Sequence, residues 1–172
     1  MRLQNKNIIL RALEPSDLNA LYVWENDAEI WKVSSTQTPF SRYVLEQYIA
    51  SSHQDIYSVK QLRLMICDAT GKAVGCIDLF DFDPNHLRAG IGILIAEESE
   101  RRKGYASEAL ELLIKYCFET LNLHQLYCNV TPENEPSVLL FQKHKFQITG
   151  IKKQWLREAE GFADELFLQL IR

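Results

Sequence analysis

The order of the predicted elements indicates a mixed α/β fold, with a mostly antiparallel central sheet and helices on both faces. Three strand-like runs, over 62–68, 73–82 and 87–96, follow one another with only short turns between them. Short turns join antiparallel neighbours, whereas parallel neighbours need a longer crossover. A long helical pattern over 104–121 separates the third run from the next strand at 125–131. That arrangement is expected of a β-α-β unit added to an antiparallel meander.

The N-terminal part of the chain predicts one strand and two helices. Residues 8–13 alternate enough for a first strand, and the run Pro15-Ser16-Asp17 opens a helix that extends to about Glu25. Residues 26–40 are polar and are predicted to be irregular. A second helix is expected from Ser41 to Ser51.

Turn residues bound the three hairpin strands. The segments 69–72 and 83–86 contain the Gly, Pro, Asn and Asp residues that favour turns. Gly90 and Gly92 lie inside the third of these strands. Glycine within a strand suggests a bulge or a close backbone approach.

The C-terminal half contains the clearest helix, at 104–121, because its apolar residues recur at helical spacing. These residues are Ala106, Ala109, Leu110, Leu113, Tyr116 and Cys117. A helix from Asn134 to about His144 follows the strand at 125–131. Two last strands are predicted at 147–157 and 164–171.

Composition limits the class of protein. The chain has 172 residues, 47% hydrophobic and 24% charged, with a net charge of −4. We expect residues 1–172 to form a single domain. An acidic chain argues against a nucleic-acid partner, which needs a basic face, and favours cationic substrates.

The sequence also predicts a cytoplasmic protein without a membrane partner. It has no apolar run of signal-peptide length and no stretch that approaches a membrane span. Cys67, Cys76, Cys117 and Cys128 are scattered without metal-type or redox-type spacing. Buried, reduced thiols are the simplest interpretation.

A basic glycine turn precedes the long helix and predicts a site for a pyrophosphate. The N-terminus of a helix presents unpaired N–H groups and about half a positive charge. Gly104 allows a ligand to approach the backbone, and the segment 101–103 adds three cations. The alternative is a solvated basic turn that only caps the helix.

Two motifs in register resemble the GNAT superfamily of acetyltransferases. The pattern Arg101-x-x-Gly104-x-Ala106 resembles its acetyl-CoA motif, and residues 134–146 resemble its second signature. The opening segment 9–22 resembles the group that contains ribosomal-protein-alanine and spermidine acetyltransferases. The resemblance covers nearly the whole chain. It implies the GNAT fold, with the sheet splayed between its fourth and fifth strands, and acetyl-CoA as co-substrate without a metal.

The resemblance also implies which residues hold acetyl-CoA. Pantetheine would pair with the backbone of one strand, and the pyrophosphate would lie on the amides of the glycine turn. Asn134 would touch the cofactor arm, although Asn is also a preferred N-cap residue. The predicted cofactor contacts are Ile93, Leu94, Ile95, Arg101, Arg102, Lys103, Gly104, Tyr105, Ala106 and Asn134.

The acceptor side is less well defined by the resemblance. Many members carry a Tyr that protonates the leaving thiolate where this chain has Phe141. We expect that side chain to face the cofactor gap. Asp78 is the predicted proton acceptor, with Asp81 expected on the other face of the same strand. Glu25, Glu29 and Asp81 are predicted substrate contacts, and solvated rim acids are the alternative for each acid.

Three functions stay open at this point. The first is acetyl transfer from acetyl-CoA to a small primary amine, such as a diamine or spermidine, by direct attack in a ternary complex. The second is acetylation of a peptide N-terminus of the ribosomal-protein-alanine type. The third is an acyl-CoA sensor without turnover, which Phe141 alone suggests. A homo-oligomer is compatible with each of them.

Overall fold

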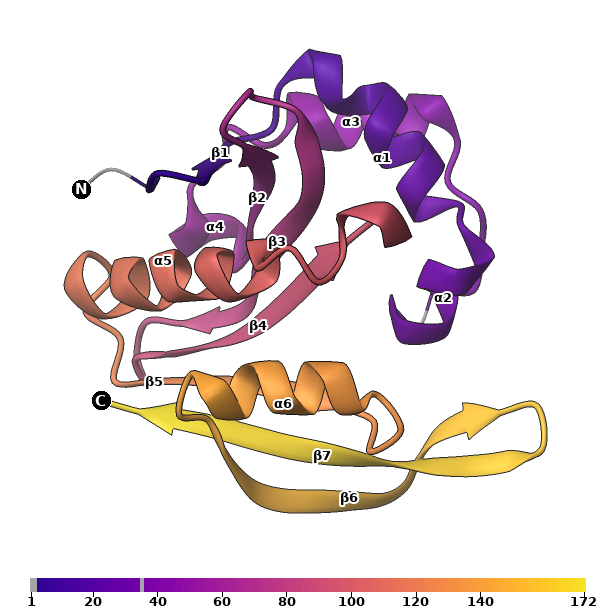
Figure 1. Cartoon of the computed structure of the whole chain (residues 1–172), viewed down its shortest axis with the longest axis vertical. Coiled ribbons are helices and arrows are strands. Elements are labelled where there is room, and N and C mark those ends of the chain that lie inside the picture. Colours follow the sequence, from indigo (N-terminus) through magenta and orange to yellow (C-terminus); the bar gives the residue numbers. More distant parts are fainter. Residues whose placement is uncertain (1–2, 35) are drawn as a thin grey trace.

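A single mixed sheet organises the part of the chain that the computed structural model describes, residues 3–34 and 36–172 (Figure 1). The strand order is β1-β2-β3-β4-β5-β7-β6. Every neighbouring pair is antiparallel except β4 and β5, which are parallel. The strands are β1 (Ile8–Arg11), β2 (Leu62–Asp68), β3 (Ala73–Asp83), β4 (Arg88–Ile95), β5 (Gln125–Val130), β6 (Gln147–Glu158) and β7 (Gly161–Ile171). The predicted mostly antiparallel sheet is confirmed.

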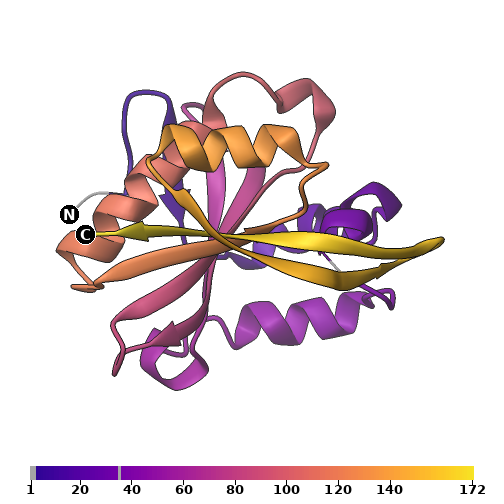
Figure 2. The ribbon, with the colours of Figure 1, turned by 90° about the horizontal axis from the view of Figure 1, so that it is seen from below.

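Helices cover both faces of this sheet, with α5 and α6 on one side and α3 on the other (Figure 2). The short helices η1 (Pro15–Asp17) and η2 (Glu98–Glu100) accompany α1 (Leu18–Glu25), α2 (Ala28–Ser34), α3 (Arg42–Ala50), α4 (Ile56–Val59), α5 (Tyr105–Glu119) and α6 (Glu135–Lys143). The larger core includes Leu110 and Leu113 of α5 and Phe141 of α6. A smaller core on the opposite face joins Leu21 of α1 to Leu45 of α3.

Residues 26–40 are not wholly irregular, because they contain α2. The carboxylate of Asp27 accepts a hydrogen bond from the N–H of Glu29 at 2.8 Å, which satisfies a donor in the first turn. Ile30 is buried in the smaller core and anchors the helix. The helix has only seven residues, about two turns, which is too short for an apolar periodicity to be recognised in the sequence. Ser35, also in this interval, lies outside the described residues.

Two smaller differences from the predicted elements concern a short helix and the start of the last strand. The helix α4 was not predicted, and its N-cap Asp55 accepts from the N–H groups of Tyr57 and Ser58. The strand β7 begins at Gly161, three positions before the predicted start at 164. The hairpin of β6 and β7 therefore extends further and projects beyond the rest of the sheet (Figure 1).

The parallel pair β4 and β5 diverges along its length. The two strands pair only from Arg88 to Gly90 and from Gln125 to Tyr127. Residues 91–95 of β4 and 128–130 of β5 continue without pairing to each other. The predicted splay between the fourth and fifth strands is confirmed, and α5 and α6 flank it (Figure 1).

A bulge near the end of β3 turns one acidic residue to the other face. The register shifts between Phe80 and Asp83, which leaves an extra residue on β3. Asp81 adopts a φ of 48° there, while Phe82 still enters the larger core. Asp81 therefore shares a face with Phe80 and Asp78. The prediction that Asp81 lies on the opposite face from Asp78 is wrong, because a bulge breaks the alternation of side chains.

Candidate active site

The glycine turn leads directly into the first turn of α5. Gly104 is the N-cap, has a φ of 90° and provides no side-chain cap for the helix. Its carbonyl accepts the first helical bond, from Glu108 at 3.0 Å. The N–H groups of the first turn consequently have no helical acceptor, and they can bind an anion. This is the geometry that the sequence predicted for a pyrophosphate.

The basic side chains beside this turn are mostly engaged within the protein. Arg101 donates from Nε to the carbonyl of Ile95 at 3.2 Å. Lys103 pairs with Glu100 at 2.7 Å. Arg102 has neither a hydrogen-bond nor an ion-pair partner among the described residues. Of these three cations only Lys103 is paired with a carboxylate among the described residues, while Arg101 and Arg102 keep their charges beside the turn.

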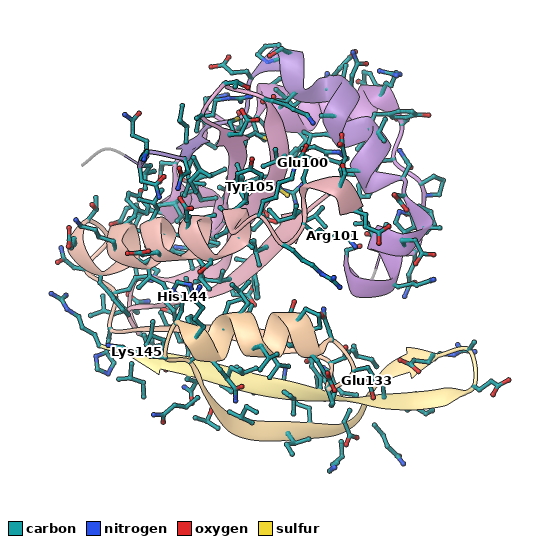
Figure 3. All side chains as sticks on the ribbon, in the orientation of Figure 1. Glu100, Arg101, Tyr105, Glu133, His144 and Lys145 are labelled. Carbon is teal, nitrogen blue, oxygen red and sulfur yellow. The ribbon has the colours of Figure 1, made fainter. Side chains whose placement is uncertain are left out.

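The glycine turn and the helices α5 and α6 lie around the splay between β4 and β5. Figure 3 shows Glu100, Arg101 and Tyr105 where the chain enters α5, with Glu133 and Lys145 at the two ends of α6. On β4, the residues 93–95 pair with β3 along one edge. Within the described part of the chain, no strand pairs with them along the other edge, which faces the splay. An extended ligand that carries amides can pair with such an edge as an added strand.

A polar cluster that was not predicted from the sequence joins α5 to α6 beside the splay. The Oγ of Ser107 lies 2.8 Å from Nε2 of His144 and accepts from Nζ of Lys143 at 3.0 Å. Burial lowers the pKa of His144, and the charge of Lys143 adds to that effect. A neutral imidazole is therefore favoured at this contact.

Asn134 occupies the N-cap of α6. Its side-chain oxygen accepts from the N–H of Ser137 at 3.3 Å. The N-cap interpretation is thus observed. A contact of Asn134 with the cofactor arm stays a prediction.

Asp78, the predicted proton acceptor, is bound on both oxygens by an arginine. Arg63 donates from Nε and Nη2 to the two carboxylate oxygens at 2.8 and 2.9 Å. The same guanidinium donates to Glu25, and it lies over the ring of Tyr48 at 5.7 Å from the centroid. Burial would lower the pKa of Arg63, but Asp78 raises it overall. We call Glu25, Arg63 and Asp78 the arginine cluster.

The arginine cluster changes the interpretation of two predicted site residues. Asp78 and Glu25 do come together, and both carboxylates accept hydrogen bonds from the single guanidinium of Arg63. A carboxylate whose two oxygens already accept guanidinium N–H groups is a poor candidate for taking a proton from an amine. Asp78 nevertheless pairs with Gly92 of β4, and a Cβ at Gly92 would meet only the Cβ of Asp78, at 3.9 Å. Space therefore lies open beside the splay at this level.

Asp81 lines a cavity on the same face of the sheet, about 620 Å³ in volume. The hydroxyl of Tyr127 donates to the carboxylate of Asp81 at 3.2 Å. Burial, then the nearby Asp81, raises the pKa of Tyr127 to about 12. The ring of Phe80 meets that of Tyr127 edge-on at 5.7 Å. The other lining residues are Asp83, Arg88, Gln125, Asn129, Lys152, Phe167 and Gln169.

Two further residues that the sequence singled out, Glu29 and Gly90, do not line this cavity. Glu29 is exposed on α2, pairs with Lys32 at 2.7 Å and does not line the cavity. Gly90 was expected to mark a bulge or a close backbone approach. A Cβ there would lie 2.3 Å from the ring of Phe80, so a side chain fills the space above this glycine. The bulge itself is on the neighbouring strand β3.

Comparison with known proteins identifies the family of this chain. The acetyltransferase (GNAT) domain family matches residues 7–147. The chain belongs to the GNAT acetyltransferase family. The spermidine N(1)-acetyltransferase of Escherichia coli K12 is 30% identical over 145 residues, which cover 84% of this chain and 75% of that protein. The spermidine N(1)-acetyltransferase of Vibrio cholerae is 28% identical over 146 residues, covering 85% and 82%.

Solved structures share the fold of this GNAT acetyltransferase. A spermidine N-acetyltransferase from Vibrio cholerae, in complex with CoA and spermine, superposes with a TM-score of 0.87. The match covers 97% of this chain and 96% of that one at 24% identity. The predicted acetyltransferase activity, with acetyl-CoA as co-substrate, follows from the family. That result sets aside the sensor without turnover.

One expectation about the GNAT helix α6 is not met. Phe141 is 3% exposed, belongs to the larger core and packs edge-on against Phe146 at 5.1 Å. The prediction that this side chain faces an open gap is wrong, because the helix turns it into the core. The residue that protonates the leaving thiolate is therefore not identified at this position.

None of the helices in residues 3–34 and 36–172 is both long and apolar enough to cross a membrane. The same described residues contain no group of three or more His, Cys, Asp or Glu side chains arranged to hold a metal ion.

Proposed function

We propose that residues 1–172 act as one GNAT domain that acetylates a primary amine of a polyamine or diamine, such as spermidine. The observation that carries this proposal is Asp81, a carboxylate that lines a cavity next to the splay without an ion-pair partner among the described residues. The similarity to spermidine acetyltransferases supports the same acceptor class.

The orientation of acetyl-CoA follows from the position of the glycine turn. The turn comes after the C-terminal end of β4, so a pyrophosphate on the amides of 102–106 starts the pantetheine arm at that end. The arm would then run back along Ile95, Leu94 and Ile93 towards Gly92. The thioester would lie where the space beside Gly92 is open.

The amine approaches from the face that carries Asp78 and Tyr127. Its neutral nitrogen attacks the thioester carbonyl carbon, the C–S bond breaks and CoA leaves as a thiolate. The new amide loses one proton to water or to a carboxylate of this face. A thiol has an ordinary pKa of about 8.5, so the thiolate can depart near neutral pH without a dedicated donor.

An acceptor screen tests the proposal. Purified protein with acetyl-CoA is offered spermidine, putrescine, an aminoglycoside, single amino acids and short peptides, and free CoA thiol is measured. Spermidine or putrescine should give the highest kcat/KM. A preference for peptides that begin with alanine would instead favour the protein N-terminal function.

The matched cofactor control is Gly104→Glu. It places a negative side chain where the pyrophosphate would lie, and a non-glycine residue would also be strained at a φ of 90°. We expect acetyl-CoA binding by calorimetry to be lost while the circular dichroism spectrum is retained. Unchanged affinity with an intact spectrum would contradict the assignment of this turn.

A further inference from the structure

The carboxylates near the splay differ in whether a cation already neutralises them. Asp78 and Glu25 share Arg63. Glu165 pairs with Lys152 at 2.8 Å and Asp83 with Arg88 at 3.3 Å. Asp81 has only the hydroxyl of Tyr127, a neutral donor, among the described residues. One negative charge in the cavity therefore remains for a ligand.

The walls of the cavity already hold an ammonium group belonging to the protein itself. Lys152 donates from Nζ to Oδ1 of Asn129 at 2.7 Å and to Oε2 of Glu165 at 2.8 Å. The same nitrogen lies 5.6 Å from the centroid of the Phe167 ring. A carboxylate, a neutral polar group and an aromatic face thus suit an ammonium ion. Asp81, Tyr127 and Phe80 repeat this combination without a cation of their own.

The distance between Asp78 and Asp81 fits the two ends of a diamine. They lie on one face of β3 about two steps of the ladder apart, because the bulge adds a residue without adding a step, which corresponds to roughly 7 Å at the usual rise of a strand. The ring of Phe80 lies between them and covers Gly90. An ammonium near Asp81 could therefore connect through methylene groups over Phe80 to an amine at Gly92.

We infer that Asp81, with Tyr127 and Phe80, forms a subsite for the second, non-reacting ammonium of a diamine or polyamine. This inference rests on the proposed function. The bulge in β3 is the device that creates the subsite, because it turns Asp81 onto the reacting face. The subsite favours acceptors that carry two positive charges, whereas the open space beside Gly92 receives only the reacting amine.

The test compares putrescine with butylamine, which has the same carbon chain but only one amine. The wild-type protein should acetylate putrescine with a kcat/KM on the order of tenfold higher. Asp81→Asn keeps an acceptor for the Tyr127 hydroxyl but removes the charge. It should raise the KM for putrescine to about that extent and leave butylamine almost unchanged.

Glu158→Gln is the matched control, since it removes one negative charge at the exposed end of β6. It should leave the ratio of the two acceptors unchanged. A putrescine preference that survives Asp81→Asn would overturn the subsite while leaving the acetyltransferase function intact.

A binding measurement separates the inference from the proposed function. If the protein acetylates neither amine, putrescine binding to the CoA-loaded protein is measured by calorimetry. Binding that Asp81→Asn weakens supports the subsite even though the proposed acceptor class has failed. No binding, or binding indifferent to that substitution, overturns it.

Discussion

Asp78 and Asp81 are the same residue type on the same face of β3, yet their surroundings make them chemically different. Asp78 is 26% exposed in its side chain, and a guanidinium binds both of its oxygens. Asp81 lies at a bulge, lines a cavity and accepts one bond from a tyrosine hydroxyl. The comparison teaches that the charge available to a substrate depends on neighbouring cations more than on the number of acids nearby.

Removal of the arginine should produce the largest effect on this comparison. Arg63→Leu leaves the carboxylates of Asp78 and Glu25 together, largely buried and without a cation. We expect the free energy of unfolding to fall by about 2–3 kcal/mol, a value reduced for their partial exposure. Urea denaturation measures the loss. Arg88→Leu is the matched control and should cost under about 1 kcal/mol, because its pair with Asp83 is more exposed.

Equal losses for the two arginine variants would show that the arginine cluster is no tighter than a surface pair. The distinction drawn between Asp78 and Asp81 would then lose its physical basis.

Two glycine substitutions test the surroundings of Asp78 and Asp81, one beneath the Phe80 ring and one in the open space at Gly92. In Gly90→Ala the new methyl would lie 2.3 Å from the Phe80 ring, so the unfolding free energy should drop by about 1–3 kcal/mol. In Gly92→Ala the nearest atom would be 3.9 Å away, and stability should change by about 0.5 kcal/mol or less. The second variant should instead slow acetyl transfer, since it fills the space proposed for the thioester.

Thermal unfolding and turnover of both glycine variants are measured together. Adding Phe80→Leu to Gly90→Ala should restore part of the lost stability. A stable Gly90→Ala variant would mean that the Phe80 ring moves aside easily and is not held over Gly90 between Asp78 and Asp81.

The smallest expected effect is on the titration of Tyr127. Its pKa is raised to about 12, above the ordinary value of about 10 for the unfolded chain. The stability that comes from the protonated phenol is therefore fully present below about pH 10 and is lost as the pH rises towards 12. Tyrosinate absorbance of the wild type minus that of Tyr127→Phe reports this group.

Asp81→Asn should lower the pKa of Tyr127 only in part, because burial is the larger cause and persists. A return to the ordinary value would show that the charge of Asp81 dominates instead. No change at all would mean that the two side chains do not interact in solution.

Local signals explain why so much of the fold could be predicted from the sequence. The apolar periodicity of α5 and the turn residues between β2, β3 and β4 act over a few positions, and each of these elements is observed where expected. The glycine turn was recognisable for the same reason, since Gly104 and the helix after it are adjacent. The helix α2 was not recognised because its seven residues are too few to show a helical periodicity.

Long-range pairing explains what the sequence could not predict about the site. Arg63 meets Glu25 across 38 positions and Asp78 across 15, and no pattern in the chain links the three. The face of Asp81 depends on how β3 registers with β4, so strict alternation misplaced it. The burial of Phe141 likewise follows from how α6 packs on the sheet, which its motif does not specify.

If acetyl-CoA binds at the bare start of α5, as proposed, its supply affects how long the folded protein persists. Gly104 contributes no capping side chain, so the first turn of this helix keeps its hydrogen-bonding capacity for whatever anion arrives. A ligand that binds only the native state stabilises it by about 2.7 kcal/mol at a concentration of 100 times its Kd. Chains made while acetyl-CoA is plentiful would therefore unfold, and be degraded, less often than chains made during scarcity. Through one uncapped helix, the abundance of the enzyme would follow the metabolic state of its cell.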